Sequence, residues 1–110
     1  MIHIERTSDG EVCRCAFIGA LDLATEARVR RALLQSLADQ PKVLVIDLAG
    51  VTFIDSTGLR ALLTVRSRAA SSGTRVVLSR VSPAVERTLE VANLTAFFEF
   101  DGAGVGANRR

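Results

Sequence analysis

The feature that most constrains the fold of this chain is a change of hydrophobic spacing, from that of a strand to that of a helix, within residues 43–63. Residues 43–46 are apolar, rich in β-branched side chains and too few for a helix, which is typical of a strand covered on both faces. Apolar side chains then recur at helical spacing, at Leu59, Leu62, Leu63, Ala69 and Ala70. The change falls on residues 55–58, Asp-Ser-Thr-Gly, which are predicted to begin a helix.

Ser56 lies in this junction, beside Asp55. A short side-chain oxygen at the start of a helix accepts a hydrogen bond from one of the first backbone N–H groups, so one interpretation of Ser56 is a helix cap. The other is a hydroxyl that accepts a phosphate, because the N-terminus of a helix favours an anion and need not unfold to hold one. Phosphorylation would add about −1.5 to −2 charge next to Asp55. The residues alone leave both interpretations open.

Composition limits the class of protein. A chain of 110 residues that is 48% hydrophobic suits one globular domain. The net charge of +2 comes from scattered arginines, and the absence of Trp and Tyr argues against direct nucleic-acid binding. No apolar run approaches the roughly 18 to 20 residues that span a bilayer, and the N-terminus lacks the pattern of a secretory signal. We therefore expect a cytoplasmic protein that binds no membrane.

Cys13 and Cys15 lie two residues apart in a predicted strand, so both point to the same face. This spacing suits neither a disulfide between them nor, without further ligands, a zinc site. They are predicted to be buried free thiols, with no metal and no cofactor in the protein.

The N-terminal half is predicted to hold two strands and a helix. A strand near His3 turns at residues 8–10 and pairs with a second strand over residues 12–18. Residues 19–22 are predicted to break this strand. Asp22 or Thr25 is predicted to cap a helix that runs to about residue 38, with an apolar stripe of Val29, Ala32, Leu33 and Leu37. Asp22 also has an open second interpretation, a role beside Ser56.

The C-terminal half continues the alternation. Gly73 is predicted to close the second helix in a left-handed conformation, and residues 75–78 to form the next strand. Ser82-Pro83 is typical of a cap followed by proline at the first helical position. Residues 97–100 are predicted to form a last strand. The resulting α/β domain has a mixed sheet, with Ser56 at the carboxyl end of the central strand, where such sheets gather their binding sites.

The sequence completes none of three enzyme motifs. A nucleophile elbow would need glycine where Ile54 stands, and His3 is the only histidine. Residues 47–51 are similar to an aspartyl-phosphate loop, but Ala49 replaces the second aspartate, so Asp47 is predicted to be a strand-end residue. A phosphate-binding P-loop motif is absent. No catalytic residue is therefore predicted, and the protein is not expected to be an enzyme.

Three segments together resemble the STAS domain of bacterial anti-sigma-factor antagonists. They are residues 19–22 (Gly-Ala-Leu-Asp), residues 45–59, which hold the most diagnostic piece, Asp-Ser-Thr-Gly-Leu, and residues 81–85. The resemblance spans about residues 10–100 in order. It implies a single STAS domain over residues 1–100, with helices packed on a mixed sheet that begins with a hairpin, followed by a flexible glycine-rich tail over residues 101–110.

The resemblance implies a binding switch. In that family the unphosphorylated antagonist binds an anti-sigma factor that is also a serine kinase, a GHKL-type ATPase, and so frees a sigma factor. Phosphorylation at the position of Ser56 reverses binding, and a PP2C-type phosphatase restores it. The implied partner-binding residues are Asp22, Asp55, Ser56, Thr57, Gly58, Leu59 and Arg60.

The chain departs from the family pattern at two places. Ala20 stands where the family often has an acidic residue, and the C-terminus offers a glycine-rich tail in place of a closing helix. The alternative function is an accessory or scaffold subunit of a transport or signalling complex without a kinase partner. The intact acceptor segment argues against the transport version.

Overall fold

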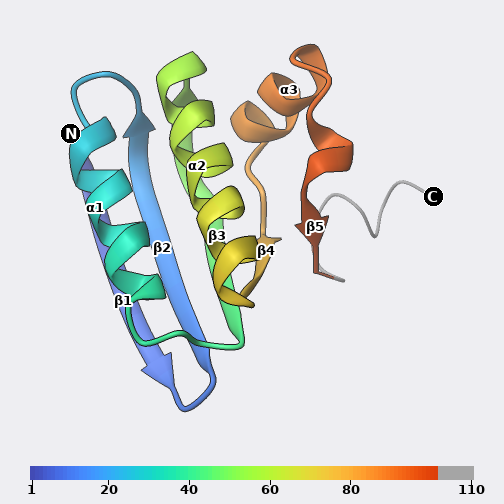
Figure 1. Cartoon of the computed structure of the whole chain (residues 1–110). Coiled ribbons are helices and arrows are strands. Elements are labelled where there is room, and N and C mark those ends of the chain that lie inside the picture. Colours follow the sequence, from blue (N-terminus) through green and yellow to red (C-terminus); the bar gives the residue numbers. More distant parts are fainter. Residues whose placement is uncertain (102–110) are drawn as a thin grey trace.

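Strands and helices alternate after an N-terminal hairpin over residues 1–101, which are the residues that the computed structural model describes (Figure 1). The strands are β1 (Ile2–Asp9), β2 (Val12–Leu21), β3 (Val43–Ile54), β4 (Arg75–Ser79) and β5 (Glu99–Phe100). The helices are α1 (Glu26–Leu37), α2 (Ser56–Ser72), α3 (Pro83–Val91) and a short 3₁₀ helix η1 (Thr95–Phe97). The sheet order is β1-β2-β3-β4-β5, antiparallel only between β1 and β2. The predicted α/β fold with a mixed sheet is confirmed.

The core lies between the sheet and the two long helices, α1 and α2, which Figure 1 shows side by side in front of the sheet. Cys13, Cys15 and Phe17 point into this core, as predicted from their alternation in β2. Both cysteines are free and buried. Burial raises the pKa of Cys15 to about 11, so its thiol stays protonated at neutral pH.

The hairpin of β1 and β2 turns at Gly10, whose φ of +60° is a conformation that glycine adopts without strain. Ser8 and Asp9, predicted to be in the turn, still pair with β2. The prediction that residues 19–22 break β2 is wrong, because β2 continues to Leu21. Two shifts of register, after Ala16 and after Gly19, let this part of β2 stay paired with β3.

The central strand β3 is longer than its apolar run suggested, since it continues through Gly50 to Ile54. The prediction that Asp47 is a strand-end residue is therefore wrong, because Asp47 lies within β3. The strand is also not fully covered on both faces. Leu44 and Ile46 are completely buried beneath the helices, whereas Val43 and Val45, which point to the opposite face, are only half-buried.

The C-terminal elements follow their local signals. Gly73 ends α2 with a φ of +80°, and Ser82 caps α3 ahead of Pro83, both as predicted. The last strand is shorter than expected because Phe97 belongs to η1 and only Glu99 and Phe100 pair with β4. The predicted flexible tail covers residues 101–110, of which all but Asp101 lie outside the described residues, so the tail stays a prediction together with the domain boundary at residue 100.

Within residues 1–101, none of the helices combines the length and the apolar character that crossing a bilayer requires.

Candidate functional site

The site is built at the carboxyl end of β3, where α2 begins directly after a single linking residue, Asp55. The Asp55 carboxylate accepts hydrogen bonds from the backbone N–H groups of Thr57 and Gly58, at 2.9 and 3.1 Å. Burial by itself raises the pKa of Asp55, but the hydrogen bonds from Thr57 and Gly58 outweigh it, and the pKa lies below its usual value. Asp55, and not Ser56, is therefore the helix cap, and it is ionised at neutral pH.

Ser56 is the first residue of α2, and its side chain is exposed. Within residues 1–101 its hydroxyl takes part in no hydrogen bond. The first interpretation drawn from the sequence, a cap, is thus wrong, because the neighbouring carboxylate satisfies the N–H groups that Ser56 would have bonded. What remains is an accessible hydroxyl in the first turn of α2.

Asp22 lies beside this junction because β2 and β3 end together. Leu21 pairs with Ile54, and the carbonyl of Leu21 accepts a hydrogen bond from the N–H of Asp55 at 3.2 Å. The Asp22 side chain accepts a hydrogen bond from the N–H of Thr25 at 3.1 Å. Asp22 therefore shapes the turn before α1.

Thr25 occupies the N-cap position of α1 but makes no side-chain cap. Its hydroxyl donates to the carbonyl of Ala20 at 2.7 Å instead. Neither of the two predicted side-chain caps of α1 therefore bonds a helical N–H group.

The remaining predicted partner-binding residues divide by exposure. Gly58 and Leu59 are buried, and an added Cβ at Gly58 would lie 2.5 Å from the carbonyl oxygen of Leu21. Their side of α2 packs against β2. Thr57 is half-buried and Arg60 is exposed, one turn beyond Ser56 on the same face of the helix. The solvent-accessible members of the set are thus Asp22, Asp55, Ser56, Thr57 and Arg60, and the partner role of all seven residues stays a prediction.

A second polar cluster, which the sequence did not predict, lies in the middle of the sheet. Asp47 is 4% exposed and accepts hydrogen bonds from Arg14 at 2.7 Å and from Arg80 at 2.8 Å. Burial raises the pKa of Asp47, but the bonds from Arg80, the N–H of Ala49 and Arg14 lower it further than burial raises it. The cluster ties β2, β3 and the end of β4 together.

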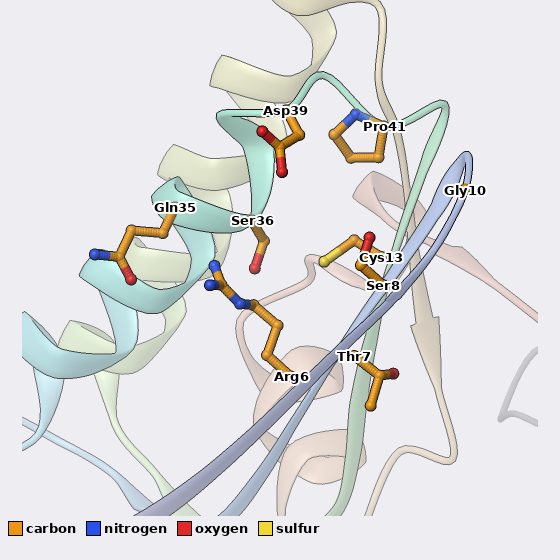
Figure 2. Close-up of a pocket in the computed structure, with 9 residues that line it drawn as sticks. All are labelled: Arg6, Thr7, Ser8, Gly10, Cys13, Gln35, Ser36, Asp39 and Pro41. Carbon is orange, nitrogen blue, oxygen red and sulfur yellow. The ribbon is translucent and has the colours of Figure 1, made fainter.

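The structure also holds a cavity of about 220 Å³ at the other end of the sheet, between the hairpin and the C-terminus of α1. Figure 2 shows the Arg6 side chain pointing into it, toward Ser36. It contains none of the predicted site residues. Among residues 1–101 there is also no group of three or more side chains that could hold a metal ion.

Comparisons with known proteins bear on the family of the chain and on its fold. The family model that describes the STAS domain matches residues 3–103. A STAS-domain containing protein of Pseudomonas aeruginosa is 28% identical over 93 residues, which are 84% of this chain and 91% of that protein. The anti-sigma-F factor antagonist RsfB of Mycobacterium tuberculosis is 38% identical over 64 residues, which are 58% of this chain and 52% of RsfB.

Solved structures show the same fold. An anti-sigma factor antagonist from Mycobacterium paratuberculosis has a TM-score of 0.78 at 28% identity, over 91% of this chain and 85% of that one. The unphosphorylated form of the anti-sigma factor antagonist SpoIIAA has a TM-score of 0.73 at 17% identity, over 92% of this chain and 88% of that one. At this identity the second likeness shows the fold alone.

Proposed function

Because the chain belongs to the STAS domain family, we propose that it is an anti-sigma-factor antagonist that is switched by phosphorylation of Ser56. The unphosphorylated chain binds an anti-sigma factor, a GHKL-type serine kinase, in the cytoplasm and thereby frees a sigma factor. Phosphate on Ser56 ends the complex, and a PP2C-type phosphatase removes it. The chain itself catalyses no step.

The observation that carries this proposal is the exposed, unbonded hydroxyl of Ser56 at the first position of α2. A kinase must bring the γ-phosphate of ATP within bonding distance of the acceptor oxygen, which a buried cap would prevent. Since Asp55 supplies the cap, Ser56 is free to accept the phosphoryl group without any loss of helix capping.

The same arrangement indicates how a phosphate would act. The N–H groups of Thr57 and Gly58 already bond the ionised Asp55, so they are not available to neutralise a second anion. A phosphate adds about −1.5 to −2 charge beside Asp55, near Asp22. Arg60 lies four residues after Ser56 and is the basic residue of the first two turns of α2. A phosphate on Ser56 could reach it. Most of the added charge therefore faces the partner, which it repels.

Relatives support the choice of partner. RsfB and the Mycobacterium paratuberculosis protein are both described as antagonists of anti-sigma factors, at 38% and 28% identity. SpoIIAA has been solved in unphosphorylated and phosphorylated forms, and this chain aligns with both, with TM-scores of 0.73 and 0.68. In that protein the fold therefore exists in both states.

The test combines the purified chain with ATP and each GHKL-type kinase of the same genome. Mass spectrometry then locates the phosphate, and size-exclusion chromatography follows the complex. We expect one kinase to form a complex and to label Ser56, after which the complex dissociates. A stable complex with another protein but no kinase that labels Ser56 would instead favour the accessory or scaffold function. Labelling at another residue alone would contradict the proposed switch.

A further inference from the structure

β1 is an edge strand of the sheet. Within residues 1–101 it pairs only with β2, so its other edge is open. The carbonyl of Met1 accepts a hydrogen bond from the N–H of Ala20, so residue 1 directs its backbone groups toward β2. Backbone groups alternate along an antiparallel strand, and the odd-numbered residues of β1 therefore bond β2 while the even-numbered ones point away. In agreement, the carbonyl of Ile2 accepts a hydrogen bond from Arg28, at 3.1 Å, and not from β2.

Of the devices that usually protect such an edge, β1 has charged side chains, at Glu5, Arg6 and Asp9, but it lacks two others. It contains no proline, and it pairs with β2 without a bulge. Within residues 1–101, the backbone groups of Ile4, Arg6 and Ser8 on this edge have no partner, and Arg28 covers only the first position. A row of backbone donors and acceptors is thus presented to solvent.

We propose that this edge pairs with β1 of a second copy of the chain, antiparallel, about a two-fold axis through Ile4. In this arrangement Ile4 lies opposite Ile4 of the second copy, and His3 lies opposite Glu5. The two sheets join into one continuous sheet.

Charge selects this register from the ones that the backbone allows. An axis through Glu5 would place two glutamates opposite each other, and an axis through Arg6 would place two arginines opposite each other. An axis through Thr7 would place Glu5 opposite Asp9. Among the axes through residues 4–7, which give the longer overlaps of the two strands, only the axis through Ile4 places no like charges opposite each other while the even-numbered backbone groups meet.

Side-chain directions agree with the proposal. Figure 2 shows Arg6 pointing to the side of α1 and Thr7 pointing to the other side of the hairpin. Ile4 is on the α1 side and half-buried, so pairing would cover the rest of an apolar side chain. His3 and Glu5 are on the other side, largely exposed, and already bond each other at 3.0 Å within one chain. In the pair they would bond across the axis as well.

Association of the unmodified chain is the first test, by sedimentation velocity over micromolar to millimolar concentrations together with amide hydrogen exchange. We expect a monomer–dimer equilibrium. Exchange at Ile4 and Arg6 should slow as the concentration rises, while exchange at Ser8, which lies outside the overlap, should not change. A monomer at every concentration would overturn the proposal, and so would slowing at Ser8 without slowing at Ile4.

Two substitutions at one position separate backbone pairing from charge. Arg6→Pro removes an outward N–H and leaves the bonds to β2 intact, whereas Arg6→Val removes the same charge and keeps the N–H. We expect Arg6→Pro to weaken dimerisation roughly tenfold or more and Arg6→Val to retain it. Equal dimerisation of the two variants would contradict pairing through the edge.

A charge exchange provides a second test that does not depend on proline. Glu5→Lys alone should weaken the dimer, because it removes the carboxylate that faces His3 of the second copy. Adding His3→Glu should restore the attraction and the dimer. Both positions are exposed, so neither change should alter the melting temperature of the dilute monomer. Failure of the double variant to recover association would count against the register. None of these results depends on Ser56 or on a kinase.

Discussion

The N-termini of α2 and α3 both carry a serine, but the two serines differ in exposure and in whether they cap the helix. In α2 the cap is Asp55, and the serine that follows it is exposed. In α3 the serine is itself the cap. Ser82 accepts a hydrogen bond from the N–H of Val85 at 3.4 Å and is only 6% exposed.

The difference teaches that one neighbouring residue decides whether a serine at a helix terminus is structural or accessible. The first turn of a helix has free N–H groups, and a short side-chain oxygen at the N-cap position can accept hydrogen bonds from them. At α2 this oxygen belongs to a carboxylate, so the hydroxyl next to it is left over. At α3 no carboxylate directly precedes Ser82, so the Ser82 hydroxyl itself accepts the hydrogen bond from the helix.

The largest expected effect comes from exchanging each serine for alanine. Ser56→Ala should keep the fold and the partner complex and should accept no phosphate from the cognate kinase. Ser82→Ala should be labelled on Ser56 as the unmodified chain is. Phosphopeptide mass spectrometry distinguishes the two. Labelling of Ser56→Ala at the rate of the unmodified chain would show that the acceptor lies elsewhere.

A permanent negative charge at the accessible position should weaken partner binding. Ser56→Asp places a second carboxylate beside Asp55, and repulsion together with lost fit should raise the dissociation constant of the kinase complex about tenfold or more. Isothermal titration calorimetry measures it. Ser71→Asp, the same change at the exposed far end of α2, is the matched control and should leave the affinity unchanged. Equal affinities of both variants would argue against release by charge.

The packing beneath the α2 terminus should tolerate no added carbon. In Gly58→Ala the new Cβ would lie 2.5 Å from the backbone carbonyl oxygen of Leu21, which cannot move without disturbing β2. We expect a loss of about 1–3 kcal/mol in the free energy of unfolding, measured by urea denaturation. Ser67→Ala, at an exposed position of the same helix, should change it by less than about 0.5 kcal/mol. A neutral Gly58→Ala would show that β2 and α2 are less tightly joined than the contact implies.

The smallest effect separates the two caps by pH. Ser82→Ala should cost about 1 kcal/mol of unfolding free energy at any pH, because a hydroxyl does not titrate. The contribution of Asp55 requires its carboxylate, whose folded pKa is lowered. It should therefore be present above the ordinary value of 3.8 and be lost as the pH falls through the lowered pKa.

Denaturation at about pH 6 and about pH 3 tests this contrast between caps. The difference between the unmodified chain and Asp55→Asn should shrink on acidification, whereas the difference for Ser82→Ala should not. A constant Asp55 difference would mean that the carboxylate is not the group that stabilises α2.

The sequence by itself determined the features that depend on residues close together in the chain. Gly73 and Ser82-Pro83 marked helix ends correctly, and the apolar stripe of α1 identified its buried face. The STAS family could also be predicted from the sequence, since its diagnostic residues form continuous segments. The exposure of Ser56 could not be predicted in this way. Serine and aspartate are both good caps, and the sequence does not say which of the two neighbours caps the helix.

Only the tertiary structure decided what depends on residues far apart in the chain. β2 continues past Gly19 because β3 lies beside it, and Asp47 sits inside β3 bonded to Arg14 and Arg80, each 33 residues away. Gly58 became a packing position because Leu21 lies against it. Local propensity is a property of a segment, whereas strand pairing, burial and ion-pair partners are set only when distant segments meet. These features could therefore not be predicted from a pattern along the chain.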